Sequence, residues 1–288
     1  MTDQAAALRH LMANRREPLP VGGSTCEIIT VTSGKGGVGK SNITMNLALA
    51  LASEGRKVLI LDADIGTANI DILMGLHPRR HLGHVFEGES TLVQILCKMN
   101  DNLYLIPGAS GITGINEMPL EHLEQFRKDI LQLETMFDYL LVDTAAGVSP
   151  QVTNLLKGSD RTLLVCNHEP TSILDAYALC KVLFASDELV RMEFLANNVS
   201  SELEAEEVYG KLSVAVKHFL KKDLQYLSYV VHDKGVADGV INQKPLMLSE
   251  GASPAKDNFR TLAVKLAHGE SWASGKGVQQ LFNLLTEA

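Results

Sequence analysis

A glycine-rich octapeptide at positions 34–41 restricts this chain to few folds. It reads GKGGVGKS and matches the pattern G-x-x-x-x-G-K-[ST]. A β-branched run, Ile28–Thr32, precedes the octapeptide, and a helical pattern, Asn42–Glu54, follows it. Between a strand and a helix, such a loop turns its backbone amides inward around phosphate oxygens. The octapeptide therefore predicts a phosphate-binding loop at a strand-to-helix junction.

Each residue type in this loop has its own part in phosphate binding. Glycines let the backbone approach the phosphates without a clash of Cβ atoms, and the following helix presents the positive end of its dipole. Lys40 supplies a cation to the β- and γ-phosphates, and the Ser41 hydroxyl is a ligand for Mg²⁺. We therefore expect ATP and Mg²⁺ as cofactors. The residues expected to surround the nucleotide are Gly34, Lys35, Gly36, Gly37, Val38, Gly39, Lys40, Ser41 and Asn42.

From position 26 to position 268, the chain alternates short apolar runs with longer helical patterns. Continuous apolar runs are typical of strands that are buried on both faces. The alternation predicts a doubly wound α/β fold with a mostly parallel sheet, whose ligands bind at the carboxyl ends of the strands. Further strands are expected at Val58–Asp62, Leu103–Ile106, Tyr139–Asp143, Thr162–Cys166, Phe194–Asn197 and Tyr226–Val231, and further helices at Leu120–Glu134, Ser172–Phe184 and Glu202–Leu220.

Three regions of the chain differ in composition. Residues 1–24 carry a short helical pattern and then a linker rich in proline and glycine. Residues 25–268 hold the alternating α/β pattern. Residues 269–288 begin with a small polar linker and end in another helical pattern. We expect one ATPase domain with a short detachable segment at each end.

Charge and composition exclude several classes of protein. The net charge of −8 excludes a uniformly basic nucleic-acid-binding surface, and the absence of a basic run disfavours DNA binding. The four cysteines lack the spacing of a zinc or disulfide motif. No signal peptide or membrane-spanning run is present. We expect a soluble cytoplasmic protein with no specific nucleic-acid partner.

Carboxylates stand at the ends of two expected strands. Asp62 and Asp64 end the second strand in the segment DADIG, and Asp143 follows the apolar run at 139–142 in the segment DTAAG. Taken singly, each aspartate could be a helix N-cap or a turn residue. As strand-end carboxylates behind a phosphate loop, they instead predict a magnesium site, with Asp143 in the Walker B position. Gly147 would let a backbone amide approach the γ-phosphate.

The segment SGKGGVGKS resembles the deviant Walker A loop of the MinD/ParA class of P-loop ATPases. The resemblance implies an ATP-bound homodimer in which Lys35 of each chain reaches the partner's nucleotide and places positive charge on the transferring phosphoryl group. Taken alone, Lys35 could also be a solvated loop lysine. The resemblance further implies that Asp64 orients the attacking water and that Asp62 holds a magnesium-bound water. It also implies that Asn197 reads the adenine edge, with Asn198 or a turn role as the alternatives.

The N-terminal segment DQAAALR, at positions 3–9, resembles the D-Q-A-x-x-L-R motif of the flagellar-number ATPases of the FlhG/FleN type. Ala7 stands where many members have glycine. The resemblance implies a σ54-dependent flagellar transcription activator and an FlhF-type GTPase of the signal-recognition-particle class as partners. A frayed terminus is the alternative. The residues that would dock on the GTPase are Asp3, Gln4, Leu8 and Arg9.

The last helical pattern is amphipathic. The resemblance implies that this helix binds the membrane surface when ATP drives dimerisation, with avidity from two copies. Lys276 is the only nearby cation, so attraction to anionic lipid should be weak. The alternative is a helix that packs on the body of the chain. The two interpretations are compatible if nucleotide binding switches the helix between these positions. The residues of its apolar face are Val278, Leu281, Phe282 and Leu285.

Together these features predict a switch with slow, Mg-dependent ATP hydrolysis that controls flagellar number and placement. We expect it in the cytoplasm, with peripheral association with the membrane in the ATP-bound state. A division-site or DNA-partition ATPase of the same fold is the first alternative. The second is an adaptor that binds nucleotide without hydrolysis, which the complete set of Lys35, Lys40, Asp64 and Asp143 disfavours.

Overall fold

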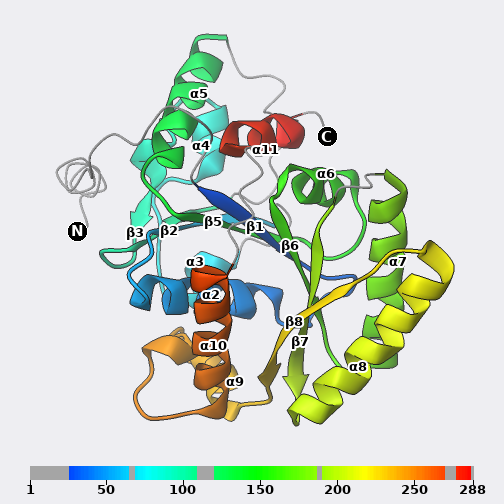
Figure 1. Ribbon diagram of the computed structural model, residues 1–288. Coiled ribbons are helices and arrows are strands. Elements are labelled where there is room, and N and C mark those ends of the chain that lie inside the picture. The colour runs from blue at the N-terminus through cyan, green and yellow to red at the C-terminus, as the bar shows by residue number, and fades with distance from the viewer. Residues whose placement is uncertain (1–25, 65–68, 109–119, 187–189, 270–276, 287–288) are drawn as a thin grey trace.

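The structure is a computed structural model that describes residues 26–64, 69–108, 120–186, 190–269 and 277–286. Its centre is an eight-stranded sheet with the order β3-β4-β2-β5-β1-β6-β7-β8 (Figure 1). All neighbouring strands run parallel except β3, which pairs antiparallel with β4 at the edge. The strands are β1 (Glu27–Thr32), β2 (Val58–Ala63), β3 (Cys97–Lys98), β4 (Leu103–Ile106), β5 (Tyr139–Thr144), β6 (Arg161–Cys166), β7 (Met192–Val199) and β8 (Gln225–Val231).

Helices cover both faces of this sheet (Figure 1). Side chains alternate along each strand, so Ile29 faces a core shared with α2 and α10, whereas Ile28 faces a core shared with α5 and α11. A third core joins α7 and α8 to β6 and β7. The helices are α2 (Lys40–Ser53), α3 (Ile70–Leu73), α4 (Leu82–Phe86), α5 (Leu120–Glu134), α6 (Pro150–Gly158), α7 (Pro170–Ser186), α8 (Glu202–Ala215), α9 (Lys234–Ile241), α10 (Pro254–His268) and α11 (Gly277–Thr286), with short turns η1 (Val93–Ile95), η3 (Val216–Leu220) and η4 (Leu246–Leu248).

The predicted doubly wound α/β fold is confirmed, and each predicted strand is present within two residues of its expected bounds. Two details differ. The two-residue strand β3 is too short to leave a sequence pattern. The helix expected over Glu202–Leu220 is α-helical only to Ala215, after which η3 forms a π-helical turn. Among the described helices, none combines the length and apolar character needed to cross a membrane.

Candidate functional site

The predicted phosphate loop lies at the carboxyl edge of the sheet, between β1 and α2. β1 is flanked by β5 and β6, and β5 pairs in turn with β2. In that pairing Asp62 lies directly opposite Asp143. Three separate segments of the sequence therefore bring the loop and both carboxylates to one edge of the sheet, where ligands bind in folds of this kind.

Two glycines of the loop meet strict steric limits. A Cβ atom at Gly34 would lie 2.1 Å from the backbone carbonyl carbon of Asp175, so only glycine lets the loop rest on α7. Gly39 adopts a φ of 95° at the N-cap of α2, and its side-chain space is taken by the Asn197 amide. No side chain caps α2, so its first amides are available to a phosphate.

Lys40 is buried beside the carboxylates at the base of the loop. Its side chain belongs to the first turn of α2, and only 8% of the residue is exposed. Burial lowers the pKa of its amine, while the charges of Asp143 and Asp64 raise it. A buried cation at the start of a helix is positioned to bind a phosphate that enters the loop.

Asp143 is the most buried acid of the site, with 1% of its surface exposed. Its carboxylate accepts hydrogen bonds from the hydroxyls of Ser41 and Thr44, the latter at 3.2 Å. Burial raises the pKa of Asp143 to about 7, and the neighbouring Asp62 adds to the rise. Thr44 was not anticipated from the sequence, because its place one helical turn after Lys40 becomes significant only when β5 is known to lie behind it.

Asp62 both caps a helix and remains a candidate residue of the magnesium site. Its carboxylate accepts hydrogen bonds from the backbone amides of Asn69, Ile70 and Asp64, at 2.9, 3.1 and 3.3 Å, and so caps the start of α3. Burial raises its pKa to about 6, against the effect of these hydrogen bonds. Asp64 lies one residue beyond β2 and acts electrostatically on Lys40.

The donors at this edge fit a divalent cation. The Ser41 hydroxyl and the carboxylates of Asp62 and Asp143 are oxygen ligands of the kind that Mg²⁺ prefers. Burying two adjacent carboxylates is costly, as their raised pKa values indicate, and a divalent cation would offset that cost. In the described parts of the chain, no three His, Cys, Asp or Glu side chains are grouped as a metal site.

Lys35 contacts its own chain at the start of α7. Its ammonium forms an ion pair with Glu169 and donates a hydrogen bond to the Thr171 hydroxyl at 2.9 Å. The hydrogen bond from Lys35, together with the Lys35 charge, lowers the pKa of Glu169. No sequence pattern indicates a partner for Lys35 at residues 169–171, and this contact supplies one. The Lys35 side chain remains 35% exposed.

Asn197 and Gly147 use their amides within the protein. The Asn197 side chain donates to the Val38 carbonyl at 2.7 Å, so it fixes the phosphate loop to β7. The Gly147 amide donates to the Ser33 carbonyl at 2.9 Å. Adenine recognition by Asn197 and γ-phosphate binding by Gly147 stay predictions. The bond to Val38 leaves Asn197 one amide N–H and its carbonyl oxygen for adenine, whereas Gly147 would have to exchange its bond to Ser33. Asn198 instead accepts a 2.7 Å hydrogen bond from His232.

The predicted membrane helix α11 packs on the body of the chain. Val278, Leu281 and Phe282 are buried against α5 and α6, with the Phe282 ring edge-on to Phe126 at 5.2 Å. The expected membrane-facing surface is therefore covered in this conformation, as the alternative interpretation proposed. The side chain of Leu285 lies outside the described residues. The predicted partner-binding residues Asp3, Gln4, Leu8 and Arg9 also lie outside them.

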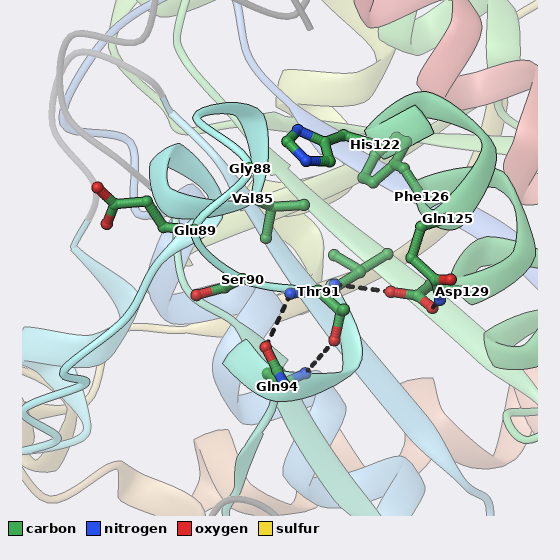
Figure 2. Close-up of a pocket in the computed structure, with 11 residues that line it drawn as sticks. Val85, Gly88, Glu89, Ser90, Thr91, Gln94, His122, Gln125, Phe126 and Asp129 are labelled. Carbon is green, nitrogen blue, oxygen red and sulfur yellow. Dashed lines mark hydrogen bonds between the residues drawn. The ribbon is translucent and has the colours of Figure 1, made fainter. Parts of the chain in front are cut away.

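A small pocket lies between α5 and the loop after α4 (Figure 2). The buried Asp129 carboxylate accepts hydrogen bonds from the Leu92 amide at 2.8 Å and from Gln125 at 2.7 Å. Thr91 and Gln94 bond to each other. These polar groups form hydrogen bonds with one another, and none belongs to the phosphate site. The hydrogen bonds therefore stabilise the loop at residues 91–94 and indicate no catalytic role for the pocket.

Comparison with known proteins agrees with this site. Residues 24–267 match the model of the ParA family, described as NUBPL iron-transfer P-loop NTPase. The chain belongs to the MinD/ParA family of P-loop ATPases. Within that family it is of the FleN/YlxH type of flagellar regulators.

Two relatives support this placement. The antiactivator FleN of Pseudomonas aeruginosa is 39% identical over 249 residues, which cover 85% of this chain and 87% of FleN. The flagellum site-determining protein YlxH of Helicobacter pylori is 37% identical over 235 residues, covering 80% of this chain and 78% of YlxH. Both alignments extend over most of the two chains, so the similarity is not confined to the phosphate loop.

Solved structures share the fold. MinD in the MinC:MinD cell division complex of Aquifex aeolicus superposes with a TM-score of 0.67 at 28% identity, covering 85% of this chain and 97% of that one. The Pyrococcus horikoshii MinD complexed with Mg-ADP gives a TM-score of 0.66 at 24% identity, covering 88% and 99%. Because the identity to the Pyrococcus horikoshii protein is only 24%, this similarity supports the fold alone.

Proposed function

We propose that this chain is an ATP-dependent dimerising switch that controls flagellar number and placement. The observation that carries the proposal is Lys35, which the phosphate loop contains in addition to the usual Lys40. It occurs in a chain 39% identical to the antiactivator FleN. ATP binding would close two chains face to face, and hydrolysis would reopen them. The output is a change of binding partners rather than a chemical product.

In the proposed mechanism, the amides of residues 34–41 and the buried Lys40 hold the phosphates. Ser41, Asp62 and Asp143 would hold Mg²⁺, which supplies charge neutralisation at the phosphates when it is bound. Asp64 orients the water for attack on the γ-phosphate. Its electrostatic influence on Lys40 supports a position near that phosphate.

Dimerisation would move Lys35 from its own chain to the partner's nucleotide. The pair with Glu169 is only partly buried, with side chains 35% and 48% exposed. Exposed ion pairs of this kind contribute little stability. Breaking the pair with Glu169 so that Lys35 can contact the partner's nucleotide therefore costs little free energy. There the lysine would stabilise the charge that develops on the phosphoryl group in the transition state.

The switch would also control α11. When α11 leaves the surface of α5 and α6, its apolar face could bind a membrane, and two copies in a dimer would bind more tightly than one. This accounts for a helix that is buried in the present structure and amphipathic in sequence. The protein would then be cytoplasmic, with peripheral association with the membrane when ATP is bound.

The partners proposed for the switch are an FlhF-type GTPase, docked by Asp3, Gln4, Leu8 and Arg9, and a σ54-dependent flagellar transcription activator. They are supported by the DQAAALR motif and by the names of the two relatives, an antiactivator and a flagellum site-determining protein. Specific nucleic-acid binding is not part of the proposal, in keeping with a net charge of −8.

Counting flagella per cell in a strain that carries Lys40→Ala tests the proposal. Loss of the buried cation should abolish nucleotide binding and change the number or the position of flagella. Lys128→Ala, an exposed change on α5, is the control and should leave the count unchanged. Normal flagella with misplaced septa or lost plasmids would instead assign the chain to division or partition.

A further inference from the structure

The carboxyl end of α8 joins lysines with exposed apolar side chains. We call this surface the α8-end patch and define it by Val214, Lys217, His218, Phe219 and Lys221. Val214 and Phe219 are 69% and 68% exposed, so the patch presents two large apolar side chains to solvent. In Figure 1 this end of α8, drawn in yellow, lies at the outer edge of the molecule and apart from α11.

The local backbone explains why these side chains face solvent. After Ala215 the helix widens into the π-turn η3, and Lys221 then adopts a φ of 57°, which ends the helix. Val216 is buried and Leu220 packs against the third core, whereas Phe219 is exposed to solvent. The Phe219 ring instead lies edge-on to His218 and Tyr177, at 4.7 and 6.3 Å, which fixes it on the surface.

A groove runs between the charged and apolar groups of the patch. It is lined by Val214, Lys217, His218, Lys221 and Asp223. The Lys217 ammonium binds the Asp223 carboxylate at 2.8 Å. This pair leaves Lys221 and the adjacent Lys222 as uncompensated positive charges within the segment. The sequence as a whole has a net charge of −8, yet this surface is locally basic.

We propose that the α8-end patch binds the surface of an anionic phospholipid membrane. Lysines interact with anionic headgroups, and an exposed phenylalanine enters the boundary between headgroups and acyl chains. The phosphate backbone of DNA would compensate the lysines but would leave Phe219 and Val214 without an apolar partner. A membrane satisfies both kinds of group at once.

This contact is separate from the one proposed for α11. The patch is exposed while α11 is packed against α5 and α6, so it needs neither ATP nor release of the helix. It would give the chain a weak attraction to anionic membranes that does not depend on nucleotide, and stable association would still require the second contact that the switch adds. Membrane binding by the patch is therefore independent of the proposed ATPase cycle.

Sedimentation of the full chain with vesicles, in the absence of nucleotide, tests the patch. Vesicles of phosphatidylcholine with phosphatidylglycerol are compared with vesicles of phosphatidylcholine alone. The test variant is Lys217→Gln, Phe219→Ser, Lys221→Gln. The control is Lys234→Gln, Ile241→Ser, Lys244→Gln, which removes two exposed lysines and one exposed apolar side chain near α9. Thermal melting verifies that both variants fold.

We expect the wild-type chain and the control to bind the anionic vesicles and not the neutral ones. The test variant should lose at least about tenfold in partition coefficient, because each lysine contributes about fivefold near an anionic surface. Equal loss in both variants, or no preference of the wild type for anionic vesicles, would overturn the proposal. Binding to duplex DNA that needs the patch, without vesicle binding, would overturn it as well.

Discussion

The ammonium of Lys35 forms an ion pair with the carboxylate of Glu169, across 134 residues of sequence. Glu169 immediately precedes α7, and a glycine at position 34 lets the phosphate loop rest on the same helix. The start of α7 therefore contacts both the phosphate loop and Lys35. A change in the position of Lys35 would be transmitted directly to α7.

Replacing Lys35 should separate nucleotide binding from hydrolysis. Lys35→Ala is expected to bind ATP nearly as well as the wild type, because the buried Lys40 and the loop amides remain. Phosphate release should fall at least about 100-fold, since charge supplied to a transferring phosphoryl group is worth about 10³–10⁵ in rate. Calorimetry and a phosphate-release assay measure the two effects, with Lys128→Ala as control. A normal hydrolysis rate would remove the lysine from the mechanism.

Replacing Asp64 should stop turnover and preserve the dimer. Without a group to orient water, Asp64→Ala is expected to lose about 10²-fold or more in hydrolysis. The ATP-bound dimer should persist, because the phosphate loop and the magnesium ligands are intact. Light scattering with ATP and Mg²⁺ reports the dimer, and Asp101→Ala, at an exposed turn, is the control. Wild-type phosphate release from Asp64→Ala would contradict the assignment.

Glu134 fixes the start of α11, and its loss should loosen that helix alone. The Glu134 carboxylate accepts a hydrogen bond from the backbone amide of Gln279 at 3.2 Å. Removing such a bond costs about 1 kcal/mol, which corresponds to about fivefold faster local opening. Hydrogen exchange should show that acceleration in α11 for Glu134→Ala and not for Glu124→Ala, an exposed site on α5. Unchanged exchange in α11 would show that Glu134 does not hold the helix.

Arg161 joins two buried acids at the amino ends of the central strands. Its guanidinium lies 3.0 Å from Glu27 and 3.3 Å from Glu193, and all three side chains are nearly inaccessible. Arg161→Met leaves two buried carboxylates without their cation and should lower the free energy of unfolding by about 3–5 kcal/mol. Arg260→Met, which breaks an exposed pair with Asp257, should cost less than about 1 kcal/mol. Urea denaturation distinguishes the two, and equal effects would contradict the argument.

Local patterns were sufficient to predict every strand except β3, as well as the phosphate loop and the strand-end aspartates. Each depends on a short run of residues whose chemistry is fixed by its neighbours. The contact between Lys35 and Glu169 could not be predicted, because it joins segments far apart in sequence. The same is true of the hydrogen bond from Asn197 to the phosphate loop. Helix α11 was recognised as amphipathic, but its periodicity does not indicate whether protein or lipid covers the apolar face.

The central claim, that Lys35 completes the partner's site, is tested most directly by mixing two inactive variants. In a mixture of Lys35→Ala and Asp64→Ala chains, a mixed dimer contains one site with an intact Asp64 and the Lys35 of the partner. With half the dimers mixed and one of two sites restored in each, hydrolysis should recover to about a quarter of the wild-type rate. Each variant alone should stay inactive. If the mixture is as inactive as its components, Lys35 acts within its own chain and the account is wrong.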